Sequence, residues 1–181
     1  MPAAADDREL VTRFQKGEEG AFNELVRRYQ KPIYLIARRL VRTHQAAEDV
    51  TQDIFIKAYQ KLRDFRGEAS FFTWIYRIAV NLSLNARRKQ RVRQVLSLEA
   101  VGLSLASQGP SPDQQTENDE TLEVIQQAID RLPEKQKMVF TLRYEHNLPH
   151  AEIARILGRD EGTIKANYHH AIRKLRKAVT S

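Results

Sequence analysis

The chain has 181 residues with a formal net charge of +7, and it contains no cysteine, which excludes disulfides and thiolate metal sites. Hydrophobic residues make up 41 % of the sequence, enough for small cores. No run is long enough to span a membrane, and the N-terminus lacks the apolar stretch of a signal peptide. No stretch alternates as a strand would. We therefore expect an all-α, cytoplasmic protein of one medium or two small domains.

Charge is distributed in three blocks along the chain. Residues 1–93 carry a net charge of +8, residues 94–123 carry six acidic and no basic residues, and residues 124–181 carry a net charge of +5. The middle block contains the Pro, Gly, Ser and Gln residues typical of a flexible linker. Two basic blocks around an acidic linker indicate two nucleic-acid-binding domains. Two ordinary helical domains with incidental charge remain the alternative.

The first basic block predicts four helices. Asp6 or Asp7 can cap a short first helix, which Gly17 ends. The second helix has a long apolar stripe, and Pro32 should kink or restart it. A third helix runs from about residue 45 to residue 62, and a fourth follows a short loop.

The third predicted helix carries a compact acidic face. Within about one and a half turns its exposed side presents Glu48, Asp49, Gln52 and Asp53. On a basic protein, such a face suits a positively charged protein partner. Acidic residues near a helix N-terminus are also favoured by the helix dipole, so the spacing alone leaves both explanations open.

The stretch from Phe65 to Asn85 is the most distinctive part of the sequence. A Gly-containing loop leads into a helix that begins near Ser70, a good N-cap residue, and that we expect to end near Arg93. Aromatic rings, the amide of Asn81 and the basic run that follows suit the binding of a single nucleic-acid strand. An amphipathic helix with an aromatic core and a solvated basic end is the plain alternative.

The second basic block predicts a helix-turn-helix. A short helix with Pro149 in its first turn ends at Gly158, where a tight turn needs a positive φ, and a longer basic helix begins near Gly162. A plain helical hairpin is the alternative. The residues expected to face duplex DNA are Thr163, Lys165, Asn167, His169, His170, Arg173, Lys174 and Arg176.

Four stretches resemble, in the same order, parts of the extracytoplasmic-function (ECF) sigma factors, the compact two-domain specificity subunits of bacterial RNA polymerase. These stretches are residues 19–25, 47–55, 65–81 and 132–175. The resemblance implies two small four-helix domains. Residues 1–94 would form a domain like sigma region 2, residues 95–118 a flexible acidic linker, and residues 119–181 a region 4-like domain with the helix-turn-helix.

The resemblance also implies a role for each surface. The coiled-coil clamp of the polymerase large subunit would be contacted by Glu48, Asp49, Gln52, Asp53 and Phe55. A base flipped out of the non-template strand, with its backbone, would be held by Phe65, Arg66, Gly67, Ala69, Ser70, Phe71, Trp74, Tyr76, Arg77, Ile78, Asn81, Arg87 and Arg88. The second helix of the helix-turn-helix would enter the major groove of the upstream promoter element.

The sequence departs from the family pattern around that second helix. Asp160 and Glu161 stand where the family often has Pro-Val, Ala166 and Asn167 replace a common Ser-Arg pair, and Pro149 replaces a usual Ser. The base contacts, and hence the upstream sequence that is read, depend on these positions.

The leading hypothesis is a sigma factor that recognises and opens promoters and catalyses no reaction itself. Its expected partners are core RNA polymerase, promoter DNA and an anti-sigma factor, with no cofactor and no insertion into a membrane. The alternatives are an autonomous helix-turn-helix regulator and a sigma-like decoy that binds only the anti-sigma factor. His146 and His150 have the spacing of a zinc pair, but no third ligand is near in sequence. No phosphate loop or nucleophile motif supports an enzyme.

Overall fold

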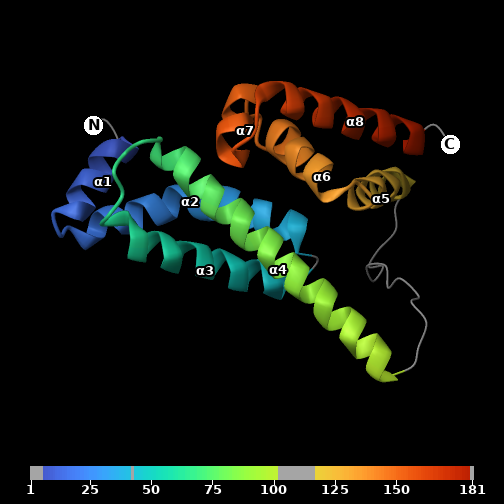
Figure 1. Cartoon of the computed structure of the whole chain (residues 1–181), viewed down its shortest axis with the longest axis horizontal. Helices are drawn as coiled ribbons and strands as arrows, with labels where there is room; N and C mark the ends of the chain where they lie inside the picture. The colour runs from blue at the N-terminus through green and yellow to red at the C-terminus, as the bar shows by residue number, and fades with distance from the viewer. Residues whose placement is uncertain (1–5, 42, 102–116, 180–181) are drawn as a thin grey trace. The chain divides into compact units, whose positions relative to one another are not determined.

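The structure is a computed structural model that describes residues 6–41, 43–101 and 117–179. Throughout these ranges the regular elements are helices and no strand is present, so the predicted all-α fold is confirmed (Figure 1). The chain divides into two compact units, Met1–Arg93 and Gln94–Ser181. Among the described helices, none has both the length and the apolar character that crossing a bilayer requires.

The helices of the first unit begin, with the exception of the second, at side-chain caps that the sequence supplies. They are α1 (Asp7–Gln15), α2 (Glu19–Leu40), α3 (His44–Leu62) and α4 (Phe71–Val101). Asp6 Oδ1 accepts the backbone N–H of Glu9 at 2.7 Å at the start of α1. Ser70 Oγ accepts the backbone N–H of Thr73 at 3.1 Å at the start of α4, as predicted. Each cap satisfies one of the amide groups that a helix start leaves unpaired.

The apolar stripes of these helices meet in one core. Leu25, Ile54 and Ile75, from three different helices, have no exposed surface. Tyr29 of α2 packs edge-on against Phe71 of α4 with 5.3 Å between ring centroids, so the start of α4 is docked on α2. Burial of each large aliphatic side chain contributes about 1.5–3 kcal/mol, and this packing fixes the base from which α4 extends.

α2 continues as one helix through Pro32, so of the two predicted outcomes, a kink or a restart, the restart does not occur. Proline removes one helical hydrogen bond and crowds the preceding turn. Ile33 and Ile36, which follow it, are completely buried. This packing holds the segment after Pro32 in the helix, since tertiary contacts override an unfavourable local preference.

α4 is longer than the sequence predicts. Its helical backbone runs to Val101, so residues 95–101 are helical where a flexible linker was predicted. The predicted linker also overlaps the start of α5, because that helix begins at Glu117. The rest of the predicted linker, residues 102–116, lies outside the described residues.

The second unit is a set of shorter helices. They are α5 (Glu117–Asp130), α6 (Glu134–Phe140), a π-helical turn η1 (Thr141–Glu145), α7 (His150–Leu157) and α8 (Glu161–Val179). Ile129, Leu132, Phe140 and Ala171 form a buried cluster. Lys137 of α6 is 1 % exposed, and its Nζ donates to Oδ1 of Asp130 at 2.8 Å and to the Asp130 carbonyl at 3.1 Å. This ion pair, which is buried at the lysine and partly exposed at the aspartate, ties α6 to the end of α5.

Candidate polymerase and nucleic-acid interfaces

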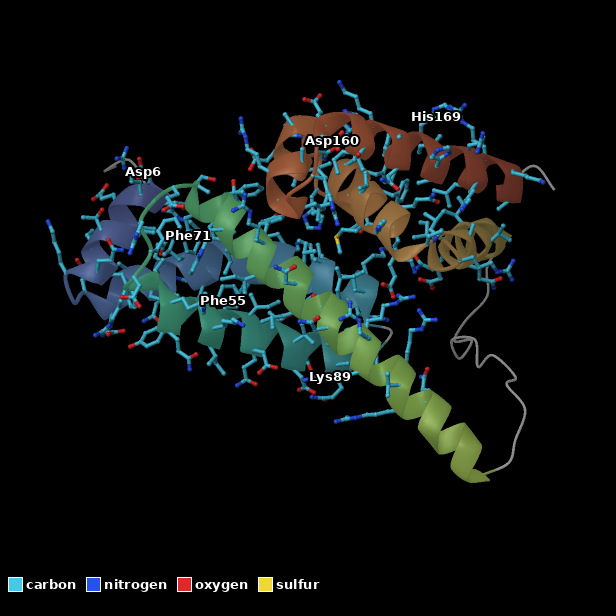
Figure 2. The ribbon with its side chains drawn as sticks, viewed as in Figure 1. Asp6, Phe55, Phe71, Lys89, Asp160 and His169 are labelled. Carbon is cyan, nitrogen blue, oxygen red and sulfur yellow. The ribbon has the colours of Figure 1, made fainter. Side chains whose placement is uncertain are left out.

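The acidic face predicted on α3 is exposed. Its members are Glu48, Asp49, Gln52 and Asp53, and all four are exposed. Val50 and Ile54, on the other side of the helix, are buried, so the face is fixed in orientation by the core. Phe55 is half-buried on the same helix (Figure 2). The arrangement offers a rigid row of hydrogen-bond acceptors and negative charge to a partner.

A groove runs between this face and α4. Its volume is about 360 Å³, and it is lined by Val50, Asp53, Leu82, Asn85, Ala86, Arg88 and Lys89. The floor is apolar, whereas Asp53 lies on the α3 rim and Arg88 and Lys89 lie on the α4 rim. A docking partner therefore meets acidic, apolar and basic groups within a short distance.

The loop before α4 lies between two packed segments. Phe65, at its beginning, has its ring 5.0 Å from the ring of Trp74. Ser70, at its end, caps α4. Between them Arg66 and Gly67 are exposed, and Gly67 has a φ of 73°, a conformation that glycine adopts without strain. The loop thus presents a cation and an open backbone to solvent.

Two aromatic residues predicted to bind the strand belong instead to the core. Phe71 and Tyr76 are 4 % and 3 % exposed, and the Tyr76 ring lies 4.2 Å from that of Phe72. Burial raises the pKa of Tyr76 to about 12. In this structure neither ring is open to a base. The predicted strand-binding residues that keep exposed surface are Phe65, Arg66, Gly67, Ala69, Ser70, Trp74, Arg77, Ile78, Asn81, Arg87 and Arg88.

The basic run of α4 is exposed except at Arg87. Arg87 is half-buried, and its Nη1 donates to the carbonyl of Leu40 at 3.1 Å. It therefore supports the last turn of α2, where helix carbonyls lack partners. Arg88 is exposed. Arg87 is thus engaged within the unit in this structure, and phosphate binding by the two arginines stays a prediction.

The helix-turn-helix has the predicted parts. Gly158 ends α7 in the left-handed conformation, with a φ of 61°. Asp160 then caps α8, because its carboxylate accepts the backbone N–H of Thr163 at 2.7 Å and the Thr163 hydroxyl at 2.6 Å. These hydrogen bonds hold the pKa of Asp160 below its ordinary value. Pro149 lies just before α7 and not in its first turn.

The predicted DNA-facing side of α8 is largely open to solvent. The exposed members are Thr163, Lys165, His169, His170, Arg173, Lys174 and Arg176, and His169 is marked in Figure 2. Asn167 is half-buried, and its Nδ2 donates to the Thr163 carbonyl at 2.8 Å. Lys165 forms an ion pair with Glu161 at 2.8 Å, which lowers the pKa of that carboxyl.

Lys174 lies on the flank of α8 that faces α5. Together with Arg131 it lines a groove of about 240 Å³ between these helices. Arg173, one residue earlier, is outside this groove, and its Nη2 is 3.2 Å from Nδ1 of His170. The cationic residues predicted to face DNA therefore lie on two sides of α8, with Arg173 on the outer side and Lys174 on the flank next to α5.

The histidine pair lies in the same unit. Burial lowers the pKa of His146, and the His150 ring packs edge-on against Tyr168 at 5.5 Å. Among the described residues, no three His, Asp, Glu or Cys side chains are close enough to share a metal ion.

Comparison with known proteins agrees with this division. Residues 25–93 match the family model described as Sigma-70 region 2, and residues 122–175 match Sigma-70, region 4. The RNA polymerase sigma-H factor of Pseudomonas aeruginosa is 34 % identical in an alignment 186 residues long, which covers 99 % of this chain and 96 % of that protein. The chain belongs to the ECF sigma factors of bacterial RNA polymerase.

Other relatives of this sigma factor are equally similar. The ECF sigma-E factor of Escherichia coli K12 is 36 % identical, covering 94 % of this chain and 93 % of that protein. SigW of Bacillus subtilis is 34 % identical, and the match covers 93 % of this chain and 94 % of that protein.

Among solved structures, CnrH in complex with the cytosolic domain of CnrY gives a TM-score of 0.72 at 23 % identity and covers 96 % of this chain and 97 % of that one. RpoE of Bartonella quintana, in complex with the anti-sigma factor NepR, gives a TM-score of 0.69 at 24 % identity, and the match covers 88 % of this chain and 96 % of that one. Both show the same fold.

Sequence reasoning missed two residues that shape the surfaces of this sigma factor. Asp160 was noted only as a departure from the family pattern, although Asp three residues before Thr163 is a common capping arrangement. Gln15 of α1 reaches the segment before the exposed loop, with its Nε2 2.9 Å from the Phe65 carbonyl. No local signal indicates a contact between residues 50 positions apart.

Proposed function

We propose that this sigma factor directs core RNA polymerase to promoters through three separate surfaces. The acidic face of α3 binds the clamp of the polymerase large subunit, the loop of residues 66–69 with the exposed side of α4 binds the melted non-template strand, and α8 binds upstream duplex. The observation that carries the proposal is the exposed loop that contains Arg66. The rings of Phe65 and Trp74 pack against each other beside this loop, and the helix that follows it bears Arg77 and Asn81.

The acidic face supports polymerase binding because its charges are exposed and held by the core. A basic coiled coil docked there would replace water around four polar side chains with charged hydrogen bonds, which are stronger than neutral ones. The neighbouring groove supplies apolar surface, so the contact does not depend on charge alone.

The loop and α4 support capture of a single strand. A flipped base loses a few kcal/mol of stacking, which is offset when it meets aromatic edges and an amide that reads its exposed side. Phe65 and Trp74 are the half-exposed rings at this position, and Asn81 is the exposed amide. Arg66, Arg77 and Arg88 are placed to meet phosphates.

α8 supports duplex binding. Its buried line includes Ile164 and Ala171, and the side that faces away from this line is cationic. A helix presented in this way by a helix-turn-helix fits the major groove, and each lysine or arginine that neutralises a phosphate releases counterions.

An anti-sigma factor is a further proposed partner. Two proteins of the same fold were solved with a second protein bound, RpoE with the anti-sigma factor NepR and CnrH with the cytosolic domain of CnrY. In this proposal RNA synthesis belongs to the polymerase, and the sigma factor acts with it in the cytoplasm without catalysing a reaction of its own.

The test is reconstitution of the full chain with purified core polymerase, followed by sequencing of transcript start sites on genomic DNA. We expect a restricted set of start sites that share an upstream and a downstream element. Binding of the free chain to duplex DNA without any effect on start-site choice would instead favour the autonomous regulator.

A further inference from the structure

Gln15, the last residue of α1, lies at the C-terminal end of α3. Its Nε2 is 3.1 Å from the Leu62 carbonyl, 3.4 Å from the Arg63 carbonyl and 2.9 Å from the Phe65 carbonyl. All three neighbours are carbonyl oxygens, which only accept, so the NH₂ end of the amide must face them, and its two N–H groups are shared among the three acceptors. The side chain thus adds a second donor to the Leu62 carbonyl, which already accepts the backbone N–H of Phe65 at 3.2 Å, and it also reaches the chain beyond α3.

The loop of residues 66–69 is therefore held at both ends. At its start, Phe65 is fixed through its carbonyl by Gln15 and through its ring by Trp74. At its end, Ser70 caps α4 and shares a 2.8 Å hydrogen bond with the Thr73 hydroxyl. Only four residues lie between these fixed points. One of them, Gly67, has a positive φ, which residues other than glycine rarely adopt.

We infer that Gln15 is a positioning residue for the capture of single-stranded DNA. By fixing the Phe65 carbonyl it keeps the loop in one conformation, so less conformational entropy is lost when the strand binds. The inference rests on the proposed role of this loop. It adds a residue of α1, remote in sequence, that acts through the backbone and does not touch the DNA.

The same geometry predicts which functions are spared. The partners of Gln15 lie at the end of α3, whereas the acidic face occupies its N-terminal half. Asp53 is nine residues before Leu62, about 13 Å along a helix at 1.5 Å per residue. A change at Gln15 should therefore leave polymerase binding unaltered.

The test compares Gln15→Glu, which keeps the shape but removes both donors, with Gln15→Ala. The matched control is Gln60→Glu, the same change at an exposed glutamine of α3. Each full-length variant is assembled with core polymerase. The affinity for a fluorescent single-stranded oligonucleotide, carrying the non-template sequence of a promoter mapped by start-site sequencing, is then measured below the melting temperature of every variant.

We expect Gln15→Glu to bind the oligonucleotide roughly five- to tenfold more weakly, as the loss of one or two hydrogen bonds implies. Gln15→Ala should lose somewhat less, because no carboxylate then repels the three carbonyls. Gln60→Glu should match the wild type, and the affinity of all variants for core polymerase should be equal. Trypsin should cut faster after Arg66 in both Gln15 variants, since the loop is less restrained.

Two results would overturn the inference. One is wild-type affinity of both Gln15 variants for the strand, and the other is an equal loss of strand and polymerase affinity, which would mean a general structural role. Arg66→Ala separates the inference from the proposed function. If Arg66→Ala also binds the strand normally, the role of the loop itself fails; if it weakens binding while the Gln15 variants do not, only the role of Gln15 fails.

Discussion

Each unit places a glycine-containing loop before the helix proposed to meet nucleic acid, but the two loops end in different caps. In the first unit Ser70, a neutral hydroxyl, caps α4, and no acidic residue follows in the first turn. In the second unit the Asp160 carboxylate caps α8, and Glu161 follows at once. A neutral cap leaves the positive end of the helix dipole available to a strand, whereas two carboxylates offset it. Attraction to DNA must then come from further along α8.

The strongest test of this division concerns polymerase binding, which we assign to the first unit alone. Reversal of two charges, Asp49→Lys with Asp53→Lys, should weaken binding to core polymerase at least about 30-fold, because it sets cations against a basic partner. The measurement is a titration of labelled sigma factor with core polymerase. The double reversal Asp64→Lys with Glu68→Lys adds the same charge elsewhere in the unit and should leave the affinity nearly intact. Equal losses in the two variants would remove the acidic face from the interface.

The next effect separates strand opening from duplex binding. Asn81→Ala should reduce promoter opening by roughly tenfold while duplex binding is retained, because the amide is proposed to read a flipped base. Permanganate reactivity reports opening and gel shifts of closed duplex report binding. Asn23→Ala, the same change at an exposed position of α2, is the control. A parallel fall in both assays for Asn81→Ala would contradict the division.

A smaller effect distinguishes the outer side of α8 from its flank. Arg173→Ala should lower the slope of log affinity for duplex against log salt by about one, a change of roughly fourfold between 50 and 200 mM salt. Lys174→Ala should change the slope less, because Lys174 lines the groove beside α5. A larger change for Lys174 than for Arg173 would reverse this assignment.

The smallest effect concerns the caps themselves. Ser70→Ala should destabilise the first unit by about 1 kcal/mol at every pH, because one amide of α4 loses its partner.

The cap of the second unit should depend on pH. The pKa of Asp160 lies below its ordinary value of 3.8, so the contribution of its carboxylate to stability is present above that value and is lost as pH falls through the lower folded-state pKa. The difference in melting temperature between wild type and Asp160→Ala should therefore shrink below about pH 4 in calorimetry. A difference that stays constant down to pH 2 would exclude the carboxylate as the cap.

Local signals in the sequence predicted the helices that have clear starts and stops. Ser70 as a cap, Gly158 as a turn and the apolar line through Ile164 each depend on a few neighbouring residues. The end of α4 was misjudged because the chain loses its amphipathic pattern after Arg93, although no helix breaker occurs before Gly102.

The functional surfaces were predicted less completely, because exposure depends on partners far away in sequence. Tyr76 carries a ring suited to stacking, but the fold turns it inward. Arg87 and Arg88 look equivalent in the sequence, yet Arg87 bonds to Leu40, 47 residues earlier. Periodicity places a residue on one side of its own helix and does not say which other helix covers that side.

The ion pair of Lys137 and Asp130 changes how the electrostatics of this sigma factor should be counted. Lys137 adds one positive charge to any tally of the second unit, but its ammonium is sealed inside the fold and neutralised by a neighbouring carboxylate. An ion in that position displaces no counterion from DNA. Binding measured against salt should thus reveal fewer effective cations than the sequence contains, and Lys137 accounts for one of the missing charges because the unit uses it to hold α6 on α5.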